Sequence, residues 1–169
     1  MIVRNAIPQD AFSLAAISME VWVGTYLRHG VSRFFAEYAL NEFTAARFEA
    51  AIAGDEDHII VSENTEGIDG FARLSLPSDA PVAACEGPEI KTLYVQPRHH
   101  GKGIGKGLLN AALERAAQLG ARSVWLTVNA ENSAARDFYL ALGFQTIGTT
   151  YFRIADQTYP NDVLQREIG

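Results

Sequence analysis

Apolar and polar residues alternate with two different periods along this chain, and each period predicts one kind of secondary structure. Apolar residues three or four positions apart are typical of one face of a helix, whereas strict alternation or a short apolar run is typical of a strand. Helical spacing predicts helices at 9–21, 32–53 (with a break near Asn41), 103–119 and 133–142. The other two patterns predict strands at 2–4, 58–62, 68–76, 89–95, 123–128, 145–154 and 162–167.

Turn residues separate these segments. Residues 64–67 read N-T-E-G, which predicts a hairpin between two of the strands, and residues 77–88 form a loop rich in proline, alanine and acid. Gly120 and Gly143 follow two of the helices at the position of a C-terminal cap.

One succession of elements predicts the topology. Strand 89–95, helix 103–119 and the nearly continuously apolar strand 123–128 follow one another with short connections, which indicates a right-handed parallel crossover. No internal repeat or interdomain linker interrupts the pattern. We therefore expect residues 1–169 to form a single α/β domain.

Composition narrows the class of protein. The 169 residues are 48% hydrophobic and 20% charged, as in an ordinary globular domain. The formal net charge of −6 argues against nucleic acid as a partner, because proteins that bind it usually carry a basic face. The acidic balance suits a cationic substrate, but it is equally typical of proteins that are acidic for solubility alone.

Several classes of site and location are not expected. Cys85 is the only cysteine, so it cannot form an intramolecular disulfide, and no helix start stands near it to activate its thiol. The four histidines, at 29, 58, 99 and 100, lack metal-ligand spacing, so we expect no metal. No apolar run reaches roughly 18 residues and the N-terminus lacks the pattern of a signal peptide, so we expect a cytoplasmic protein without a membrane partner.

The most informative segment is the glycine-rich turn at 96–107, Q-P-R-H-H-G-K-G-I-G-K-G. Its glycines remove Cβ atoms where backbone N–H groups must approach a ligand closely. A turn at a helix N-terminus attracts anions through these N–H groups and through the helix dipole. The turn therefore predicts a phosphate or pyrophosphate site, with Lys102 and Lys106 adding positive charge.

Two nucleotide-binding motifs fit this turn poorly. A Walker loop requires Ser or Thr after the Gly-Lys pair, and no such pair is followed by either here. A dinucleotide fingerprint requires G-x-G-x-x-G and a carboxylate after the next strand, whereas the spacing here is G-x-G-x-G and that strand ends at Val128-Asn129. Taken alone, the glycines would equally suit a tight turn without a ligand.

Two motifs together resemble a known family. Residues 93–109 resemble the coenzyme A motif of the GNAT N-acetyltransferases, [QR]-x-x-G-x-[GA], with His100 where the family usually has Arg or Gln. A second GNAT signature, N-x-x-A-x-x-F-Y-x-x-x-G-F, follows at 132–144. The resemblance covers Glu89 to Phe144 and implies a GNAT-like α/β (α+β) fold. Its central mixed, mostly antiparallel sheet would have about six to seven strands, flanked by about four helices.

The resemblance also implies a site for acetyl-CoA. Leu93, Tyr94 and Val95 match the strand whose backbone pairs with the pantetheine arm, and Asn132 matches a cofactor contact from the last helix. The pyrophosphate cradle would consist of His100, Gly101, Lys102, Gly103, Ile104, Gly105 and Lys106.

Two residues match catalytic positions of the family. Glu89 matches the general base of some members, which would deprotonate the amine, and Tyr139 matches the phenol that faces the thioester sulfur and would protonate the departing thiolate. A backbone N–H of strand 89–95 would stabilise the oxyanion. Each residue also has a plain structural interpretation: Tyr139 as a packed helix residue, Asn132 as a helix cap and Glu89 as a solvated strand end.

The sequence predicts only the chemical class of the acceptor. The chain loosely resembles PaiA-type bacterial polyamine acetyltransferases, which implies a small primary amine with polyamines first. Aromatic residues such as Trp22 and Tyr26 are more often part of a core than of a substrate site, but in this fold their region commonly borders the acceptor site. Glu20 or Glu86 would attract a cation. Amines of protein N-termini or lysines remain open, as does a homodimer.

Two other functions remain alternatives. A catalytically idle acyl-CoA-binding regulatory domain would bind acetyl-CoA without releasing thiol, although it would have no need of Tyr139. A nicotinamide oxidoreductase is weakened by the missing ribose carboxylate.

Overall fold

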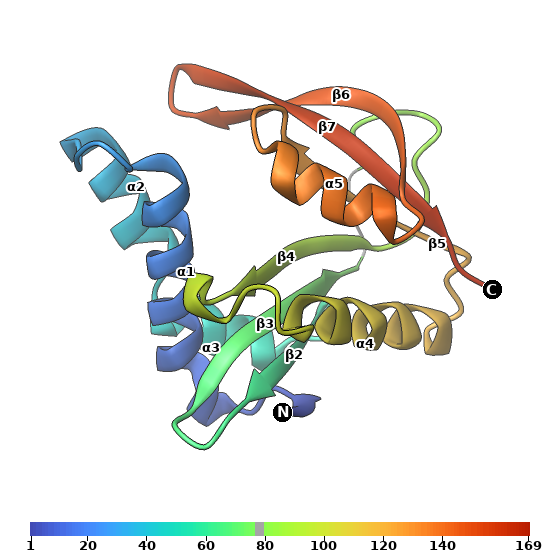
Figure 1. Cartoon of the computed structure of the whole chain (residues 1–169), viewed down its shortest axis with the longest axis horizontal. Helices are drawn as coiled ribbons and strands as arrows, with labels where there is room; N and C mark the ends of the chain where they lie inside the picture. Colours follow the sequence, from blue (N-terminus) through green and yellow to red (C-terminus); the bar gives the residue numbers. More distant parts are fainter. Residues whose placement is uncertain (77–79) are drawn as a thin grey trace. The chain divides into compact units, whose positions relative to one another are not determined.

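Seven strands and five α-helices are present among the described residues of the computed structural model, 1–76 and 80–169 (Figure 1). The strands are β1 (Ile2–Asn5), β2 (Asp57–Glu63), β3 (Ile68–Ser75), β4 (Glu89–Val95), β5 (Ser123–Asn129), β6 (Gln145–Ile154) and β7 (Gln157–Glu167). The helices are α1 (Ala11–Tyr26), α2 (Arg33–Glu42), α3 (Ala45–Ala53), α4 (Ile104–Gln118) and α5 (Ser133–Ala141), with short 3₁₀ turns at Pro8–Asp10 (η1) and Pro97–His99 (η2).

The strands form one mixed sheet in the order β1-β2-β3-β4-β5-β7-β6. β4 and β5 pair in parallel, with Glu89 opposite Trp125, while β1 with β2, β5 with β7 and β6 with β7 pair antiparallel. The mixed, mostly antiparallel sheet that the GNAT resemblance implies is therefore confirmed.

Three boundaries differ from the sequence prediction by several residues. The helix expected at 9–21 spans Ala11–Tyr26. The expected break near Asn41 lies three residues later, because the Thr44 hydroxyl accepts a hydrogen bond from the Arg47 N–H and so begins a new helix, α3. The last strand begins at Gln157 rather than at 162, since β7 pairs with β6 from the hairpin turn onward. The expected loop at 77–88 lies partly outside the described residues, which omit 77–79.

The chain divides into two compact units. The N-terminal unit comprises Met1–Arg73 and Thr92–Ala112, and the C-terminal unit comprises Leu74–Lys91 and Leu113–Gly169.

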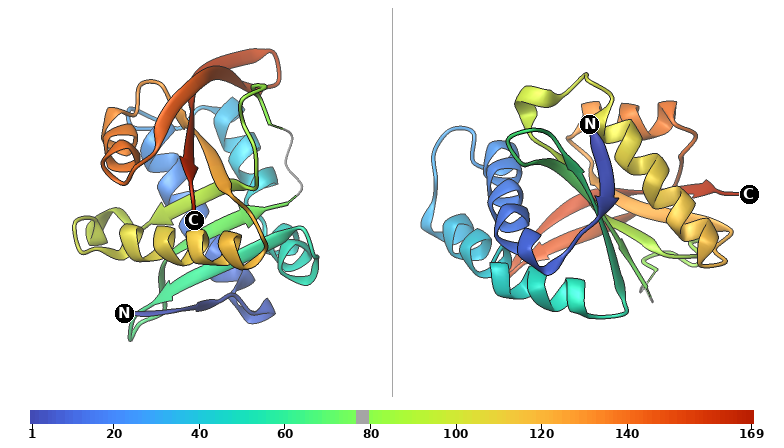
Figure 2. Two further views of the ribbon diagram at one scale, coloured as in Figure 1. Left: turned by 90° about the vertical axis from the view of Figure 1, so that its right-hand side faces the viewer. Right: turned by 90° about the horizontal axis from the view of Figure 1, so that it is seen from below.

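The N-terminal unit has an apolar core on each face of its strands, because successive side chains of a strand point to opposite faces. On one face, residues such as Val61 of β2 and Phe71 of β3 pack against α1 and α3. On the other face, Ile60 and Ala72 pack against Leu108 and its neighbours on α4. Figure 2 shows α1 and α3 on one side of these strands and α4 on the other.

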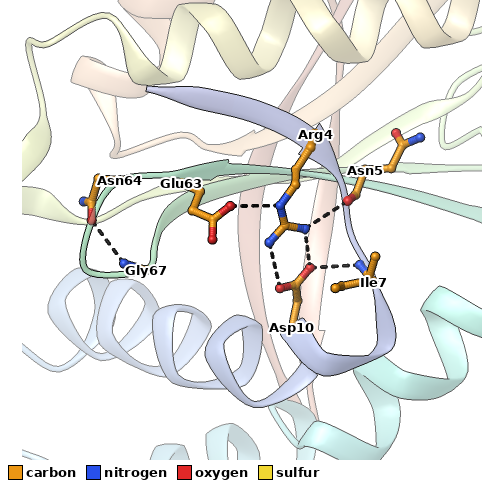
Figure 3. A network of polar contacts seen from close by, with 7 residues as sticks. All are labelled: Arg4, Asn5, Ile7, Asp10, Glu63, Asn64 and Gly67. Carbon is orange, nitrogen blue, oxygen red and sulfur yellow. Dashed lines mark hydrogen bonds and ion pairs between the residues drawn. The ribbon is translucent and has the colours of Figure 1, made fainter.

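A polar network joins β1, β2 and the start of α1 in the same unit (Figure 3). The Arg4 guanidinium donates to Asp10 Oδ2 at 2.8 Å, to Asp10 Oδ1 at 3.1 Å and to Glu63 Oε2 at 2.9 Å. Asp10 also accepts a hydrogen bond from the Ile7 N–H at 2.8 Å. The Arg4 hydrogen bonds hold the pKa of the Asp10 carboxyl below its usual range, although burial opposes this shift. This network fixes the chain where β1 leads into α1.

The C-terminal unit contains the β5-β7-β6 part of the sheet together with α5. Arg136 of α5 donates to Asp162 of β7 at 3.2 Å. Cys85, Trp125 and Val163 form a small buried cluster in this unit. The Trp125 indole N–H donates to the Gly87 carbonyl at 3.1 Å. Gly87 has a φ of 87°, and a Cβ there would collide with the Ser123 carbonyl oxygen, so this close approach requires glycine.

Candidate functional site

The first half of the glycine-rich turn is folded back on itself by hydrogen bonds. The Gln96 N–H donates to the Asp69 carbonyl at 2.9 Å, and η2 is closed by the His99 N–H, which donates to the Gln96 carbonyl at 2.9 Å. The His100 ring then returns to the end of β4, with Nε2 at 3.0 Å from the Val95 carbonyl oxygen. A carbonyl can only accept, so this contact requires the hydrogen to be on Nε2. His100, at the position where the family usually has Arg or Gln, therefore tethers the turn to the strand.

The second half of the turn leaves backbone N–H groups at the start of α4. Gly101 and Gly103 have φ values of 78° and 83°, a left-handed conformation that favours glycine. No atom lies within 4 Å of a Cβ built on either residue, so the backbone conformation rather than crowding selects them. The Gly107 N–H donates to the Gly103 carbonyl at 3.0 Å, so the first-turn N–H groups before it have no acceptor within the helix. This arrangement can bind an anion.

The lysines of the turn differ in their contacts. Lys102 is exposed and its Nζ lies 3.1 Å from His99 Nδ1, so the ammonium can donate to the ring. Lys106 is exposed on the first turn of α4. Both add positive charge beside the first-turn N–H groups.

The β4 residues at 93–95 use their side chains in the two cores of the N-terminal unit. The Tyr94 ring lies 5.8 Å from the Phe71 ring, edge to face, on the side of α1 and α3. Leu93 and Val95 pack in the core on the side of α4. Leu93 and Tyr94 are partly buried and Val95 is buried, so packing occupies much of their side chains, and the resemblance assigns the ligand contact to their backbone.

On α1, Trp22 is the centre of an aromatic cluster. Its side chain is only 4% exposed. Its ring lies 4.9 Å from Tyr26, 5.2 Å from Tyr38, 5.8 Å from Phe35 and 6.1 Å from Phe43, measured between ring centres. Burial, and to a lesser extent the charge of Glu42, raises the pKa of Tyr38 to about 12. Trp22 is thus a core residue, and the partly exposed rings around it form the surface of the cluster.

Glu20, also on α1, already has two partners. Its Oε1 accepts from Arg98 at 2.8 Å and its Oε2 accepts from Gln96 Nε2 at 3.1 Å. The sequence analysis assigned Glu20 to the amine acceptor and did not foresee either contact. Gln96 and Arg98 lie 76 and 78 residues away along the chain, and no local pattern links them to a helix so distant.

Glu89 belongs to the C-terminal unit, as the partly buried first residue of β4. It lies near Cys85: burial, and secondarily the charge of Glu89, raise the pKa of the Cys85 thiol to about 11. At neutral pH Cys85 is therefore a thiol rather than a thiolate, as expected for a residue without a nucleophilic role. Glu86 is exposed.

Tyr139 and Asn132 lie on and before α5, in the same C-terminal unit. The Tyr139 ring lies 5.2 Å from Phe138 and 5.5 Å from Phe144. Burial raises the pKa of the Tyr139 hydroxyl, so at neutral pH the phenol retains the proton that a general acid must donate. The Asn132 Oδ1 accepts from the Ala135 N–H at 3.1 Å and caps α5, which leaves its amide N–H₂ available for another contact.

The site residues inferred from sequence thus form two groups. The N-terminal unit brings together the end of β4, the glycine-rich turn and Glu20, and it also contains the cluster around Trp22 and Tyr26. The C-terminal unit contains Glu89, Asn132 and Tyr139. Among residues 1–76 and 80–169, no three His, Cys, Asp or Glu side chains are grouped so that they could hold a metal ion, and no helix is long and apolar enough to cross a membrane.

Comparison with known sequences gives a family match over most of the chain. The model of the acetyltransferase (GNAT) family matches residues 19–144. An uncharacterized N-acetyltransferase of Mycobacterium bovis is 30% identical over 159 residues, which cover 94% of this chain and 98% of the relative. The N-alpha-acetyltransferase RimI of Mycobacterium tuberculosis is 30% identical over 112 residues, covering 65% of this chain and 67% of the relative.

Solved structures share the fold at lower sequence identity. PaiA N-acetyltransferase from Thermoplasma acidophilum, in complex with coenzyme A, superposes with a TM-score of 0.79 over 99% of this chain and 98% of its own, at 19% identity. Ribosomal-protein-alanine N-acetyltransferase from Brucella melitensis gives a TM-score of 0.70 over 99% and 100%, at 20% identity.

Proposed function

Because the chain belongs to the GNAT acetyltransferase family and is an acetyl-CoA-dependent N-acetyltransferase, we propose that it acetylates a primary amine of a small molecule, with polyamines as first candidates. In this proposal residues 1–169 act as one catalytic domain. The observation that carries it is the glycine-rich turn, whose left-handed glycines lead into first-turn N–H groups suited to a pyrophosphate.

The proposed reaction is a direct attack of the amine on the thioester. The neutral amine forms the new N–C bond while the C–S bond to coenzyme A breaks. The amine gives up one proton and the departing thiolate takes one. The backbone of residues 93–95 is proposed to hold the pantetheine arm and to donate an N–H to the carbonyl oxygen as negative charge develops there, a contact typically worth about 10²–10³ in rate.

Two side chains are proposed to move these protons. Glu89, directly or through water, would accept the proton that an amine carries at neutral pH. Tyr139 would donate to the thiolate: its hydroxyl, like any phenol, is protonated at neutral pH, and burial raises its pKa further. Asn132 is proposed to contact the cofactor through its amide N–H₂ while its carbonyl caps α5.

The acceptor is proposed to approach the surface of the aromatic cluster around Trp22, where Tyr26 and Tyr38 are partly exposed. The formal net charge of −6 and the exposed Glu86 favour a cationic amine. A polyamine satisfies both features, since it pairs cationic groups with a methylene chain that can pack on aromatic rings.

A second candidate is an amine at the N-terminus of a protein. The similarity to the N-alpha-acetyltransferase RimI favours it, because that relative is 30% identical over 112 residues. A peptide acceptor would contact a longer surface than a free polyamine, so the two acceptors are separable by assay.

The test is a panel of amines assayed with acetyl-CoA by detection of the released thiol. The panel contains spermidine, a neutral aromatic monoamine and a short peptide with a free N-terminus. We expect the highest kcat/KM for spermidine, and a KM for spermidine that rises with salt, since exposed charges are screened beyond about 8–10 Å at physiological ionic strength.

Other outcomes separate the parts of this proposal. Preference for the monoamine without a salt effect would reject polyamines as the acceptor but would be consistent with acetyltransferase activity. Preference for the peptide would favour the second candidate. Binding of acetyl-CoA without thiol release for any amine would indicate an idle regulatory domain.

A further inference from the structure

Glu20 connects helix α1 to the start of the glycine-rich turn. Its two carboxylate oxygens accept from two different residues, Arg98 at 2.8 Å and Gln96 at 3.1 Å. These residues lie on either side of Pro97, so one side chain of α1 holds the residue before η2 and the middle residue of η2. The Glu20 side chain is 34% exposed and that of Arg98 is 62% exposed, so water has access to the ion pair but does not surround the carboxylate.

The residues held by Glu20 lead directly into the proposed pyrophosphate cradle. Between Val95 and His100 the chain is closed by hydrogen bonds of its own and forms one compact turn. After it come Gly101 and Gly103, whose backbone conformations are left-handed and whose lack of side chains allows no packing to fix them. The first turn of α4 is held by the buried side chains of Ile104 and Leu108, so it is the backbone N–H groups of residues 101–103, before the helix, whose orientation depends on how the preceding segment is anchored.

We infer that Glu20 is a positioning residue for the cofactor and not a contact for the acceptor amine. By holding Gln96 and Arg98 it keeps the turn in the conformation in which the N–H groups of residues 101–103 join those of α4 at the pyrophosphate. This inference rests on the proposed function, because it assumes that the turn binds acetyl-CoA. A preordered site avoids the entropy loss of ordering the loop on binding, and so binds more tightly.

Charge repulsion alone predicts the opposite change in cofactor affinity when Glu20 is lost, which makes the inference testable. A carboxylate next to a site for a polyanion repels the ligand, and its removal would also free the Arg98 charge. If charge alone mattered, loss of Glu20 would tighten cofactor binding. The pair is partly exposed, so this repulsion is weakened by water and salt. We therefore expect the loss of order to dominate.

The experiment measures coenzyme A affinity by isothermal titration calorimetry for the wild type, Glu20→Ala, Glu20→Gln, Arg98→Ala and the double variant Glu20→Ala/Arg98→Ala. We expect the dissociation constant to rise about three- to tenfold in Glu20→Ala, as for the loss of one charge-assisted hydrogen bond and one exposed ion pair. The double variant should be little weaker than Glu20→Ala, because the two residues act through one contact. Glu20→Gln, which retains an acceptor for Gln96, should lie between.

A kinetic measurement separates positioning from general structural damage. The KM for acetyl-CoA should rise in Glu20→Ala while kcat at saturating acetyl-CoA and the KM for the amine remain near the wild-type values. Glu37→Gln is the matched control for cofactor affinity: it removes one negative charge from an exposed ion pair, that with Arg33 at 3.2 Å, on α2, a helix with no residue in the proposed cofactor site. It should leave the coenzyme A affinity unchanged.

Each remaining outcome has a definite meaning. An unchanged or tighter affinity in Glu20→Ala would overturn the inference, as would a rise in the amine KM alone, which would return Glu20 to the acceptor. If Glu20→Ala does not fold, the coenzyme A affinities of Glu20→Gln and Arg98→Ala test the inference instead. Glu20→Gln keeps an acceptor for Gln96, and Arg98→Ala keeps the Glu20 carboxylate. A wild type that binds no coenzyme A would refute the proposed function itself, a result distinct from equal binding by wild type and variants.

Discussion

Helices α4 and α5 begin in different ways, although both are assigned to the cofactor by the family resemblance. At α5, the Asn132 side chain accepts from the Ala135 N–H and so satisfies one of the free donors of the first turn. At α4, the residue before the helix is Gly103, which has no side chain with which to cap it. The first-turn N–H groups of α4 thus remain for a ligand, while one at α5 is used by the protein.

Two of the other described helices, α2 and α3, follow the pattern of α5. Ser32 accepts from the N–H of Phe35 at the start of α2, and Thr44 does the same for Arg47 at the start of α3. Asp10, beside the start of α1, is held by Arg4 and by the Ile7 N–H. Among the described helices, α2, α3 and α5 thus have a capping side chain, whereas α1 has no capping side-chain hydrogen bond and α4 begins after a glycine, at the proposed anion site.

The largest predicted effect concerns the body of α5 rather than its start. Tyr139→Phe should lower kcat by about 10²-fold, the lower end for a general acid, because the ring packing against Phe138 and Phe144 remains while the proton donor is lost. The affinity for acetyl-CoA should change little. Single-turnover kinetics at saturating acetyl-CoA measure this, and an unchanged chemical step would assign the hydroxyl a structural role only.

The next effect tests the uncapped start of α4. Gly103→Val should raise the dissociation constant of coenzyme A about 10- to 100-fold, as for the loss of a hydrogen bond to a charged group, because a branched side chain occupies the space proposed for the phosphates. Gly120→Val is the matched control. Gly120 has a φ of 85°, close to the 83° of Gly103, and no atom lies within 4 Å of a built Cβ at either position.

The two valine variants should therefore lose similar stability, and only the one at 103 should lose affinity. Thermal unfolding and titration calorimetry on both proteins make the comparison. Equal affinity losses would mean that backbone strain, rather than a blocked cradle, explains the effect at Gly103.

A smaller effect is expected at the start of α1, and it depends on pH. Asp10 is buried against Arg4 and its folded-state pKa is lowered, so its contribution to stability is present above the unfolded pKa and is lost as pH falls through the folded one. Asp10→Asn should therefore reduce the free energy of unfolding by about 1–3 kcal/mol at pH 7. The difference from wild type should shrink as the pH is lowered below about 4.

Chemical denaturation at several pH values measures this difference, with coenzyme A affinity of the folded variant as the second measurement. A constant difference between pH 7 and pH 3 would exclude the Arg4 ion pair as its source. A loss of affinity in the folded variant would contradict the view that this helix start serves stability alone.

The smallest effect tests the start of α5. Asn132→Ala should cost about 1 kcal/mol of stability through loss of the cap, while Asn132→Ser should restore most of it because serine also caps. If the amide also contacts the cofactor, both variants should bind coenzyme A more weakly, and serine should not rescue the affinity. Full rescue of both quantities by serine would show that Asn132 acts only as a cap.

Most of the fold could be predicted from the sequence because its signals are local. The apolar run at 123–128 and the helical spacing at 103–119 each describe one element completely, and both elements are present within one residue of the expected ends. The break in the helical region at 32–53 was displaced, because Asn41 and Thr44 both suit a turn and only the hydrogen bond from the Arg47 N–H to Thr44 distinguishes them.

Part of the candidate site could also be predicted, because its residues are contiguous in the sequence. Gly101, Gly103 and the helix that follows them are contiguous, so their spacing alone indicated a turn with free N–H groups. The role of Glu20 was not predictable in this way, since its partners lie 76 and 78 residues away. From the sequence it was one acidic residue among 20, and nothing distinguished it as a partner of Arg98.

By itself, then, the sequence determined the order and type of the elements, the glycine-rich turn before a helix and the family, because backbone preferences and contiguous motifs depend on neighbouring residues. Only the tertiary structure decided which side chains are already engaged. It buried Trp22 inside an aromatic cluster and joined Glu20 to the glycine-rich turn. It also raised the pKa of Tyr139 by burial. These properties depend on which distant residues surround a group and exclude water from it, and the pattern along the chain does not encode that locally.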